Sequence, residues 1–381
     1  MKTILTSFLM SLMLVALPSG VPAQDTLSRS GDSTVTQKDT MKLRFLEVIG
    51  KGDVLPFNLV YQRARLNTND KGDIIDTVLM LSIQKDFAIE VVENNREKEY
   101  VMFDYIQGSF KKSGPFSDDP GYSQTTNLLS DGYPLRLGVS YDGYLFSDVE
   151  PDTLKARAEK NLAFIADTMS KSSEDVSREQ IIEDLSYMKD PSYLLSQAIS
   201  GLNSIFQFCG YEMAEGERYS YKDSLFCDID STWYSHPVIM GWTWDQSQTD
   251  SSRDAPFNIQ SISAISGMPF LSYMGCDLTK EEAVELLEKA REEGKDKRFT
   301  NLRQVEFLAD NLYGIPLLIQ TTILNGFYES IDDNAVGLDK IIIVLDVEKF
   351  VQSQEDSEDE DDEDNEDDEP RYDDYGFIKV K

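Results

Sequence analysis

From residue 41 onward, apolar and polar residues alternate in short runs that are typical of β-strands. The runs are rich in Val, Ile, Phe and Tyr, the residues that favour strands. They occupy residues 42–49, 55–66, 74–83, 87–92 and 100–106. Short polar segments separate them and suit hairpin connections. This spacing predicts an antiparallel meander rather than strands that alternate with helices.

A long loop and a further hairpin complete the first part of the chain. Residues 108–133 are rich in Gly, Pro, Ser and Asp, a composition that predicts a long loop. Residues 134–141 and 144–148 then flank Asp142-Gly143, a dipeptide that favours the two-residue turn of a hairpin. Residues 41–149 are therefore predicted to form a sheet.

The hydrophobic period changes from two to that of a helix after Pro151. Apolar residues share one helical face at Leu154, Ala158, Leu162, Ile165 and Met169. Further helices are predicted over residues 177–188 and after Pro191. Residues 150–210 are thus expected to form a helical segment that packs on the sheet.

Strand patterns return in the last part of the globular region, residues 211–350. They cover residues 217–227, 231–245, 257–265, 319–328 and 338–347. Between them, Thr279 and Glu282 have the spacing of a capping box at the start of a helix. The pattern over residues 301–313 predicts one more helix.

These elements predict an α+β fold, with antiparallel β-meander or half-barrel sheets packed with helices. The globular region would span residues 41–350, composed of a sheet at 41–149, a helical segment at 150–210 and a second sheet with helices at 211–350. An acidic tail at 351–381 would follow it.

The amino terminus has the pattern of a cleaved export signal. A basic Met1-Lys2 precedes an apolar stretch from Ile4 to Leu17, and Val21-Pro22-Ala23 suits signal peptidase. The apolar stretch is shorter than the roughly 20 residues that span a bilayer. We therefore predict a signal peptide at 1–23, a flexible lead-in at 24–40 and no transmembrane segment in the mature protein. The absence of a glycosylation sequon favours the periplasm or outer surface of a Gram-negative bacterium.

Charge narrows the range of partners. The 381 residues carry a formal net charge of -33, which disfavours nucleic-acid binding because phosphates would be repelled. Thirteen of the fifteen residues at 355–369 are acidic, so the tail is expected to repel itself and remain disordered. It could act as a solubilising extension, attract cations diffusely or hold a basic protein partner.

Residues that usually carry catalysis are sparse. His236 is the single histidine, and Cys209, Cys227 and Cys276 form no CxxC motif. In an oxidising compartment two of the cysteines could pair, with Cys209 and Cys227 as one candidate pair. The sequence assigns no catalytic residue, no metal ligand and no cofactor.

Tryptophans supply the one candidate binding site. Trp242 and Trp244 alternate along a predicted strand and therefore lie on the same side of it. A Trp pair at this spacing could line a site for a hydrophobic ligand or stack on a sugar. The alternative is that the same row faces the hydrophobic core.

The layout resembles a broad group of uncharacterised exported bacterial envelope proteins with a curved antiparallel sheet. The resemblance lies in the hairpin Tyr141-Asp142-Gly143-Tyr144, which leads into the helix from Asp152, and in the later strands around residues 216–221 and Trp242. The half-barrel carriers of bacterial lipoproteins are similar in general plan. This resemblance implies a concave apolar surface for a lipid-like or polypeptide ligand.

We therefore expect an exported, non-catalytic envelope protein that binds a hydrophobic or polypeptide ligand or has a structural role. One alternative is a glycan-acting hydrolase that uses an Asp/Glu pair and a Trp platform. The other is an acidic, cation-binding surface protein.

Overall fold

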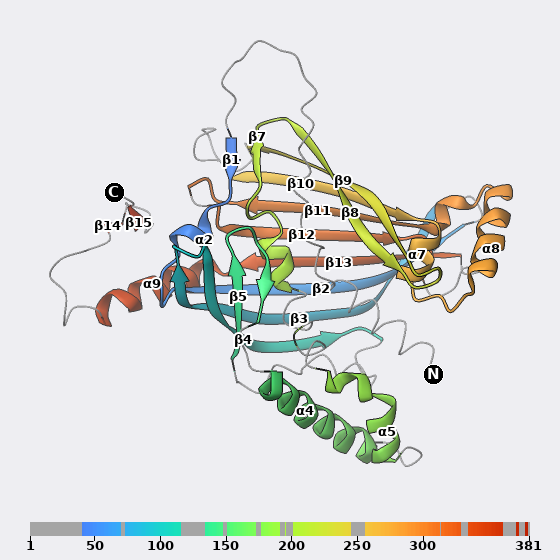
Figure 1. Cartoon of the computed structure of the whole chain (residues 1–381), viewed down its shortest axis with the longest axis horizontal. Helices are drawn as coiled ribbons and strands as arrows, with labels where there is room; N and C mark the ends of the chain where they lie inside the picture. The colour runs from blue at the N-terminus through green and yellow to red at the C-terminus, as the bar shows by residue number, and fades with distance from the viewer. Residues whose placement is uncertain are drawn as a thin grey trace, which may run out of the picture.

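The computed structural model shows an α+β fold in which a large antiparallel sheet is packed with helices (Figure 1). The fold class predicted from the sequence is therefore confirmed. The structure describes residues 40–69, 73–115, 134–147, 151–172, 177–190, 195, 201–244, 256–312, 314–328, 334–360, 371–372 and 378–379. The predicted signal peptide at 1–23, the lead-in up to residue 39 and most of the loop at 108–133 lie outside these ranges.

The central sheet has eleven strands, and each strand runs antiparallel to its neighbours. In spatial order they are β6 (Leu145–Phe146), β5 (Leu135–Ser140), β4 (Tyr100–Ser113), β3 (Ile74–Asn95), β2 (Val54–Thr68), β13 (Ala335–Leu345), β12 (Pro316–Asn325), β11 (Thr300–Ala309), β10 (Phe257–Ser266), β9 (Thr232–Trp244) and β8 (Arg218–Cys227). Two small sheets pair β1 (Thr40–Lys42) with β7 (Glu212–Ala214) and β14 (Arg371–Tyr372) with β15 (Ile378–Lys379).

The pairing of β2 with β13 joins the beginning of the chain to its end. Their register runs from Ala335 opposite Asn67 to Leu345 opposite Phe57. Through this pairing, the strands of the first predicted sheet and those of the second form one continuous sheet. Hairpins along the sequence connect most of the other neighbours, in agreement with the predicted meander.

The helices are α2 (Phe45–Val48), α4 (Pro151–Ser172), α5 (Arg178–Asp184), α7 (Met268–Tyr273), α8 (Lys280–Glu292) and α9 (Val347–Glu360), with 3-10 turns η1 (Ser186–Lys189) and η2 (Asp296–Phe299). Residues 201–206 are also helical. The capping box of α8 forms as predicted, because the Thr279 and Glu282 side chains each accept the other's backbone N–H. Within the described ranges, none of the helices combines the length and hydropathy that a membrane span requires.

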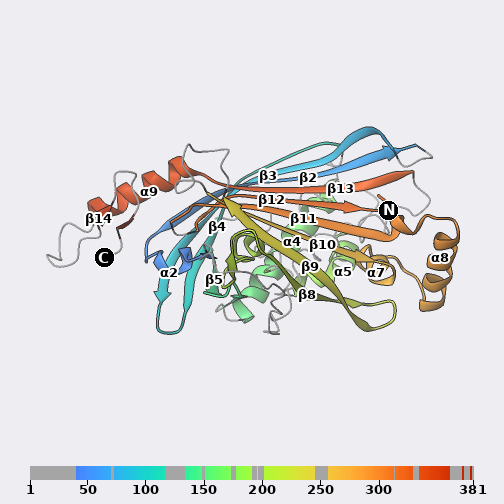
Figure 2. The same cartoon turned by 90° about the horizontal axis from the view of Figure 1, so that it is seen from above.

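The sheet is curved, and its two faces differ. Figure 2 shows that β4–β5 at one edge and β8–β9 at the other turn toward the same side, where α4 and α5 also lie. We call this side the inner face. Its side chains form the main hydrophobic core together with Leu162 and Ile165 of α4 and Ile205 and Phe206 of the helical turns at 201–206.

The Asp142-Gly143 hairpin locks one edge of the sheet to these helical turns. Gly143 has a φ of 81°, in the left-handed region that favours glycine. A side chain at this position would collide with the backbone carbonyl of Phe206. The turn predicted from the sequence therefore also serves as a point of close approach.

Four sequence-based predictions are wrong. The strands expected separately at 74–83 and 87–92 form one strand, β3, and residues 108–113 of the expected loop belong to β4. The strand expected at 42–49 is largely replaced by α2, where Asn94 Nδ2 donates to the carbonyl oxygens of Leu46 at 2.9 Å and Ile49 at 2.7 Å. The helix expected at 301–313 is strand β11. Its apolar spacing suits a helix, but β10 and β12 on either side supply hydrogen bonds that only a strand can satisfy.

Helix α9 continues into the segment predicted as an acidic tail. Asp346 caps the start of α9, because its carboxylate accepts a hydrogen bond from the backbone N–H of Lys349 at 3.3 Å. The same carboxylate pairs with the Lys349 ammonium at 2.9 Å. Phe350 packs against the main core. These contacts carry the helix into the acidic run at 355–360.

Candidate functional site

The inner face changes from apolar to polar along its strands. At one end, Phe57 of β2 lies beside Phe87 of β3, with ring centres 5.4 Å apart, and Tyr105 stacks on Phe87 at 5.3 Å. Six residue pairs further along β2 and β13, the facing residues are Arg63 and Asp339. One sheet face thus carries both an aromatic wall and buried charges.

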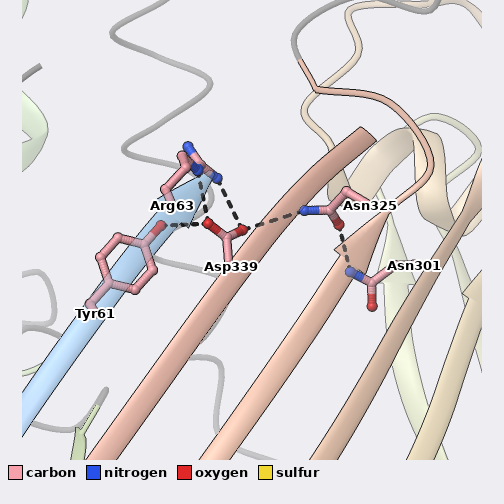
Figure 3. A network of polar contacts seen from close by, with 5 residues as sticks. All are labelled: Tyr61, Arg63, Asn301, Asn325 and Asp339. Carbon is pink, nitrogen blue, oxygen red and sulfur yellow. Dashed lines mark hydrogen bonds and ion pairs between the residues drawn. The ribbon is translucent and has the colours of Figure 1, made fainter. Parts of the chain in front are cut away.

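Asp339 is the centre of a hydrogen-bond network in the polar part (Figure 3). Its Oδ1 accepts from the Tyr61 hydroxyl at 2.7 Å and from Arg63 Nε at 2.9 Å, and its Oδ2 accepts from Arg63 Nη2 at 3.3 Å. Asn325 Nδ2 donates to Oδ2 at 3.4 Å, and Asn301 Nδ2 donates to Asn325 Oδ1 at 2.6 Å. We call these five residues the Asp339 network.

The network is buried, so its charged groups are largely removed from water. Asp339 is 8% exposed and is the one acidic side chain buried in the part of the chain that the structure describes. Because water is excluded, the ion pair with Arg63 loses solvation, and the hydrogen bonds to Tyr61 and Asn325 offset part of that cost. Burial also raises the pKa of Tyr61 well above its usual value, so its hydroxyl remains a donor.

A second group of polar side chains continues across the inner face from the network. Burial and the charge of Asp339 raise the pKa of Tyr273, on α7, to about 12. Arg303 of β11 interacts electrostatically with Tyr273 and with His236. Burial lowers the pKa of His236, and its Nε2 lies 3.9 Å from Asp223 Oδ2, too far for a hydrogen bond. Burial thus favours the neutral form of the His236 imidazole.

Two polar atoms of this region lack hydrogen-bond partners. Thr321 is 1% exposed, and its Oγ1 has no hydrogen-bond partner. On the sheet the residue lies between Ile341 and Val305, both on the inner face. The Nε of Arg303, two residue pairs further along β11 and β12, is buried and also lacks a hydrogen-bond partner. Buried polar atoms are nearly always bonded, so two unbonded atoms on one face require an explanation.

The two tryptophans predicted to bind a ligand lie in the main core. Trp242 is 2% exposed, and its indole N–H donates to the carbonyl oxygen of Met213 at 2.8 Å. It packs edge-on against Trp244 at 5.3 Å between ring centres, and Trp244 is partly buried. Both residues thus stand on the inner face, at its apolar end, and their ligand-binding role stays a prediction.

Trp233 is the exposed tryptophan of the three. It is 68% exposed, and its ring lies 5.4 Å from that of Phe226, which is 38% exposed. The pair stands on the outer face, beside the turn between β8 and β9.

The cysteines are free thiols in the structure. Burial raises the pKa of Cys209 far above its usual value and that of Cys276 to about 11, which disfavours the nucleophilic thiolate. Among the described residues, no group of three or more His, Cys, Asp or Glu is placed to hold a metal ion.

Sequence reasoning missed Arg63, Thr321 and Asp339. A usable signal was present, because each of them has the same alternation phase as the apolar residues of its strand. Asp339, for example, shares the phase of Ile341 and Ile343. A charge at a core-facing position of a predicted strand indicates either a buried partner or a binding site.

The comparisons with known proteins add little. No protein-family model matches the chain, and no curated protein matches it. A solved structure titled "lipid-protein interactions in lipovitellin" is similar over 77% of this chain and 25% of the lipovitellin chain, with 7% identity and a TM-score of 0.32. This chain spans about a quarter of that protein, and a TM-score of this size establishes neither a shared fold nor a shared function.

Proposed function

We propose that this is an exported, non-catalytic envelope protein that binds an amphipathic ligand on the inner face of its curved sheet. The hydrocarbon part of the ligand would contact the aromatic wall, and its polar part would lie near Thr321 and Arg303. The resemblance to half-barrel lipoprotein carriers implies a concave apolar surface for a lipid-like ligand, which agrees with this proposal.

The unbonded Oγ1 of Thr321 is the observation that carries the proposal. A threonine at a 1% exposed position of a strand gains nothing over valine when its hydroxyl is unbonded. A ligand with a hydrogen-bonding group would give that hydroxyl, and the nearby Arg303 Nε, a partner. The aromatic residues on the same face belong to the main hydrophobic core, and Phe57 lies four residue pairs along the sheet from the level of Thr321.

Thr321→Val tests the proposal, with Thr322→Val as the matched control. Thr322 is the adjacent residue and points to the outer face. Thr321→Val should leave stability unchanged or raise it, because no hydrogen bond in the protein is lost. It should weaken binding of amphiphiles by about tenfold, the size expected for one hydrogen bond.

The measurement uses protein recovered from the cells that make it. Solvent extraction and mass spectrometry identify bound amphiphiles, and titration of the delipidated protein then gives the affinity of each variant. Equal affinities for the Thr321 and Thr322 variants would place the ligand elsewhere, and failure to bind any amphiphile would overturn the proposal.

Export is part of the proposal and has its own test. The support is the basic residue, apolar stretch and small-residue cleavage pattern of residues 1–23. Mature protein from the periplasm or outer surface should begin at Gln24. An intact Met1 on protein recovered from the cytoplasm would contradict it.

A further inference from the structure

The outer face of the strands β10–β13 carries its residues in four rows that cross the sheet. Alternate residues of each strand pack into the core, so those between them point outward. The two border rows are mainly apolar, and the two middle rows are mainly polar. In order along the strands the rows are Ala264, Leu302, Leu324 and Leu338; Ile262, Gln304, Thr322 and Lys340; Gln260, Glu306, Gln320 and Ile342; and Asn258, Leu308, Leu318 and Val344. We call these residues the outer patch.

The apolar side chains of the outer patch remain accessible. Ile262 is 42% exposed and Val344 is 39% exposed. The five leucines of the border rows are each partly exposed. Figure 2 shows that the two edges of the sheet turn toward the inner side, so a second molecule can approach the outer face of the middle strands. Contiguous apolar side chains on a protein surface mark sites of contact with other molecules.

The outer patch is also neutral, which is unusual in this chain. Its charged residues are Glu306 and Lys340, of opposite sign, while the whole chain has a formal net charge of -33. The outer face of β3, by contrast, carries Asp86 and Glu90. Two copies of so acidic a chain repel each other wherever acidic surfaces meet. A surface depleted of charge is therefore where a second copy meets the least repulsion, and such depletion is typical of the cores of protein interfaces.

The pattern of the outer patch is complementary to itself. A two-fold axis that lies along β12, between two facing sheets, places β11 of one copy opposite β13 of the other. This rotation keeps each residue at its level along the strand. Leu302 then faces Leu338 of the second copy, Leu308 faces Val344, and Leu324 faces its own counterpart. Apolar rows thus meet apolar rows, and polar rows meet polar rows.

The two charges of the patch become partners under the same rotation. Glu306 and Lys340 of the second copy lie one row apart, about 7 Å along the strands. Facing sheets are about 10 Å apart, a separation that the long Glu and Lys side chains span. Within the part of the chain that the structure describes, neither residue forms a salt bridge, and Glu306 accepts a hydrogen bond from Asn258 Nδ2 at 3.3 Å. Each two-fold pair of copies would make the Glu306–Lys340 contact twice.

We infer that the outer patch is the interface of a symmetric dimer of this chain, in which two sheets pack face to face. With the adjoining outer-face residues of β9 and β2, the patch offers about 20 residues a side, the number that a stable interface requires. The inference is independent of the proposed ligand site, which lies on the inner face.

A charge exchange tests the dimer. Sedimentation equilibrium of the full protein should give twice the mass of one chain. Lys340→Glu and Glu306→Lys should each weaken association at least about tenfold, because each places like charges together twice in the dimer. The double variant should restore the wild-type dissociation constant to within about threefold. A mixture of the two single variants should form heterodimers, since every Glu306–Lys340 contact in such a pair again joins opposite charges.

Two further variants locate the interface. Lys111→Glu makes the same charge change as Lys340→Glu on the outer face of β4, outside the patch, and should leave the dissociation constant unchanged. Leu324→Lys places two cations opposite each other at the axis and should give monomers. Circular dichroism checks that each variant is folded, and if Leu324→Lys unfolds, the charge exchange alone decides. A monomeric wild type, a dimer that persists in Leu324→Lys, or single charge variants that fail to associate when mixed would each overturn the inference.

Discussion

The hairpin of β2 and β3 carries two inner-face cations whose surroundings are opposite. Arg63 makes two hydrogen bonds to the carboxylate of Asp339, which also accepts from Tyr61 and Asn325. Among the described residues, the Lys85 ammonium has polar and cation–π contacts with the hydroxyl of Tyr105 and with two aromatic rings, and no salt bridge. Both cations are removed from water, but only the first is neutralised by the protein.

This difference indicates two roles for buried charge in one sheet. Asp339 uses two of the donors of Arg63, which indicates a structural role for this arginine. A cation without a counter-ion weakens the fold, and selection keeps such a residue where function gains from it. The comparison predicts that mutations at the two places change stability in opposite directions.

The largest effect on stability is expected when the buried ion pair of Arg63 and Asp339 is broken. Asp339→Ala removes the carboxylate that pairs with Arg63 and that accepts hydrogen bonds from Tyr61 and Asn325. Removal of one partner of a buried ion pair costs about 3–5 kcal/mol, so this variant should lose that much free energy of unfolding. Denaturant titration followed by circular dichroism measures it, and a loss below about 1 kcal/mol would mean that the network is dispensable.

The double variant Arg63→Met with Asp339→Leu tests the coupling between the two charges of the same ion pair. It replaces both charges with apolar side chains, so no isolated charge remains in the core. Its stability should return to within about 2 kcal/mol of the wild type, which gives a strong coupling between the two sites. Additive losses in the cycle of single and double variants would show that the two residues act independently.

Lys85→Met should act in the opposite direction and stabilise the protein. The pKa of Lys85 in the folded protein, about 8, lies below its ordinary value of 10.5, so the folded state binds fewer protons between these pH values. The wild type therefore gains stability as pH rises from 8 toward 10, and the variant does not. The advantage of the variant should be about 1–3 kcal/mol at pH 7 and shrink as pH approaches 10.

This pH measurement must take into account the other titratable groups beside Lys85. Tyr105 and the neighbouring Lys112 lie beside Lys85, and burial keeps Tyr105 protonated throughout the range. Thermal unfolding of both proteins at several pH values gives the difference directly. A constant difference across pH 7–10 would show that Lys85 is solvated.

The smallest effect is expected for Lys111→Met. Lys111 precedes Lys112 on β4 but is exposed on the outer face. Exposed substitutions usually change stability by less than about 0.5 kcal/mol, so this variant should match the wild type at every pH. A stabilisation like that of Lys85→Met would mean that net charge, rather than the inner face, is responsible.

Local sequence determined most of the individual elements. The alternation of β2, β4 and β13, the turn at Asp142-Gly143 and the capping box at Thr279 depend on residues close in sequence, and the structure contains each of them. The acidic character of the chain and the pattern of its amino terminus are likewise local properties.

Tertiary structure decided how the elements combine. The pattern at 301–313 suits a helix, yet β10 and β12 make residues 300–309 a strand. The pairing of β2 with β13 brings Arg63 to Asp339, 276 residues away in sequence. Alternation assigns each strand two faces, but only long-range pairing determines which face is buried and which charges meet, because register depends on partners distant in the chain.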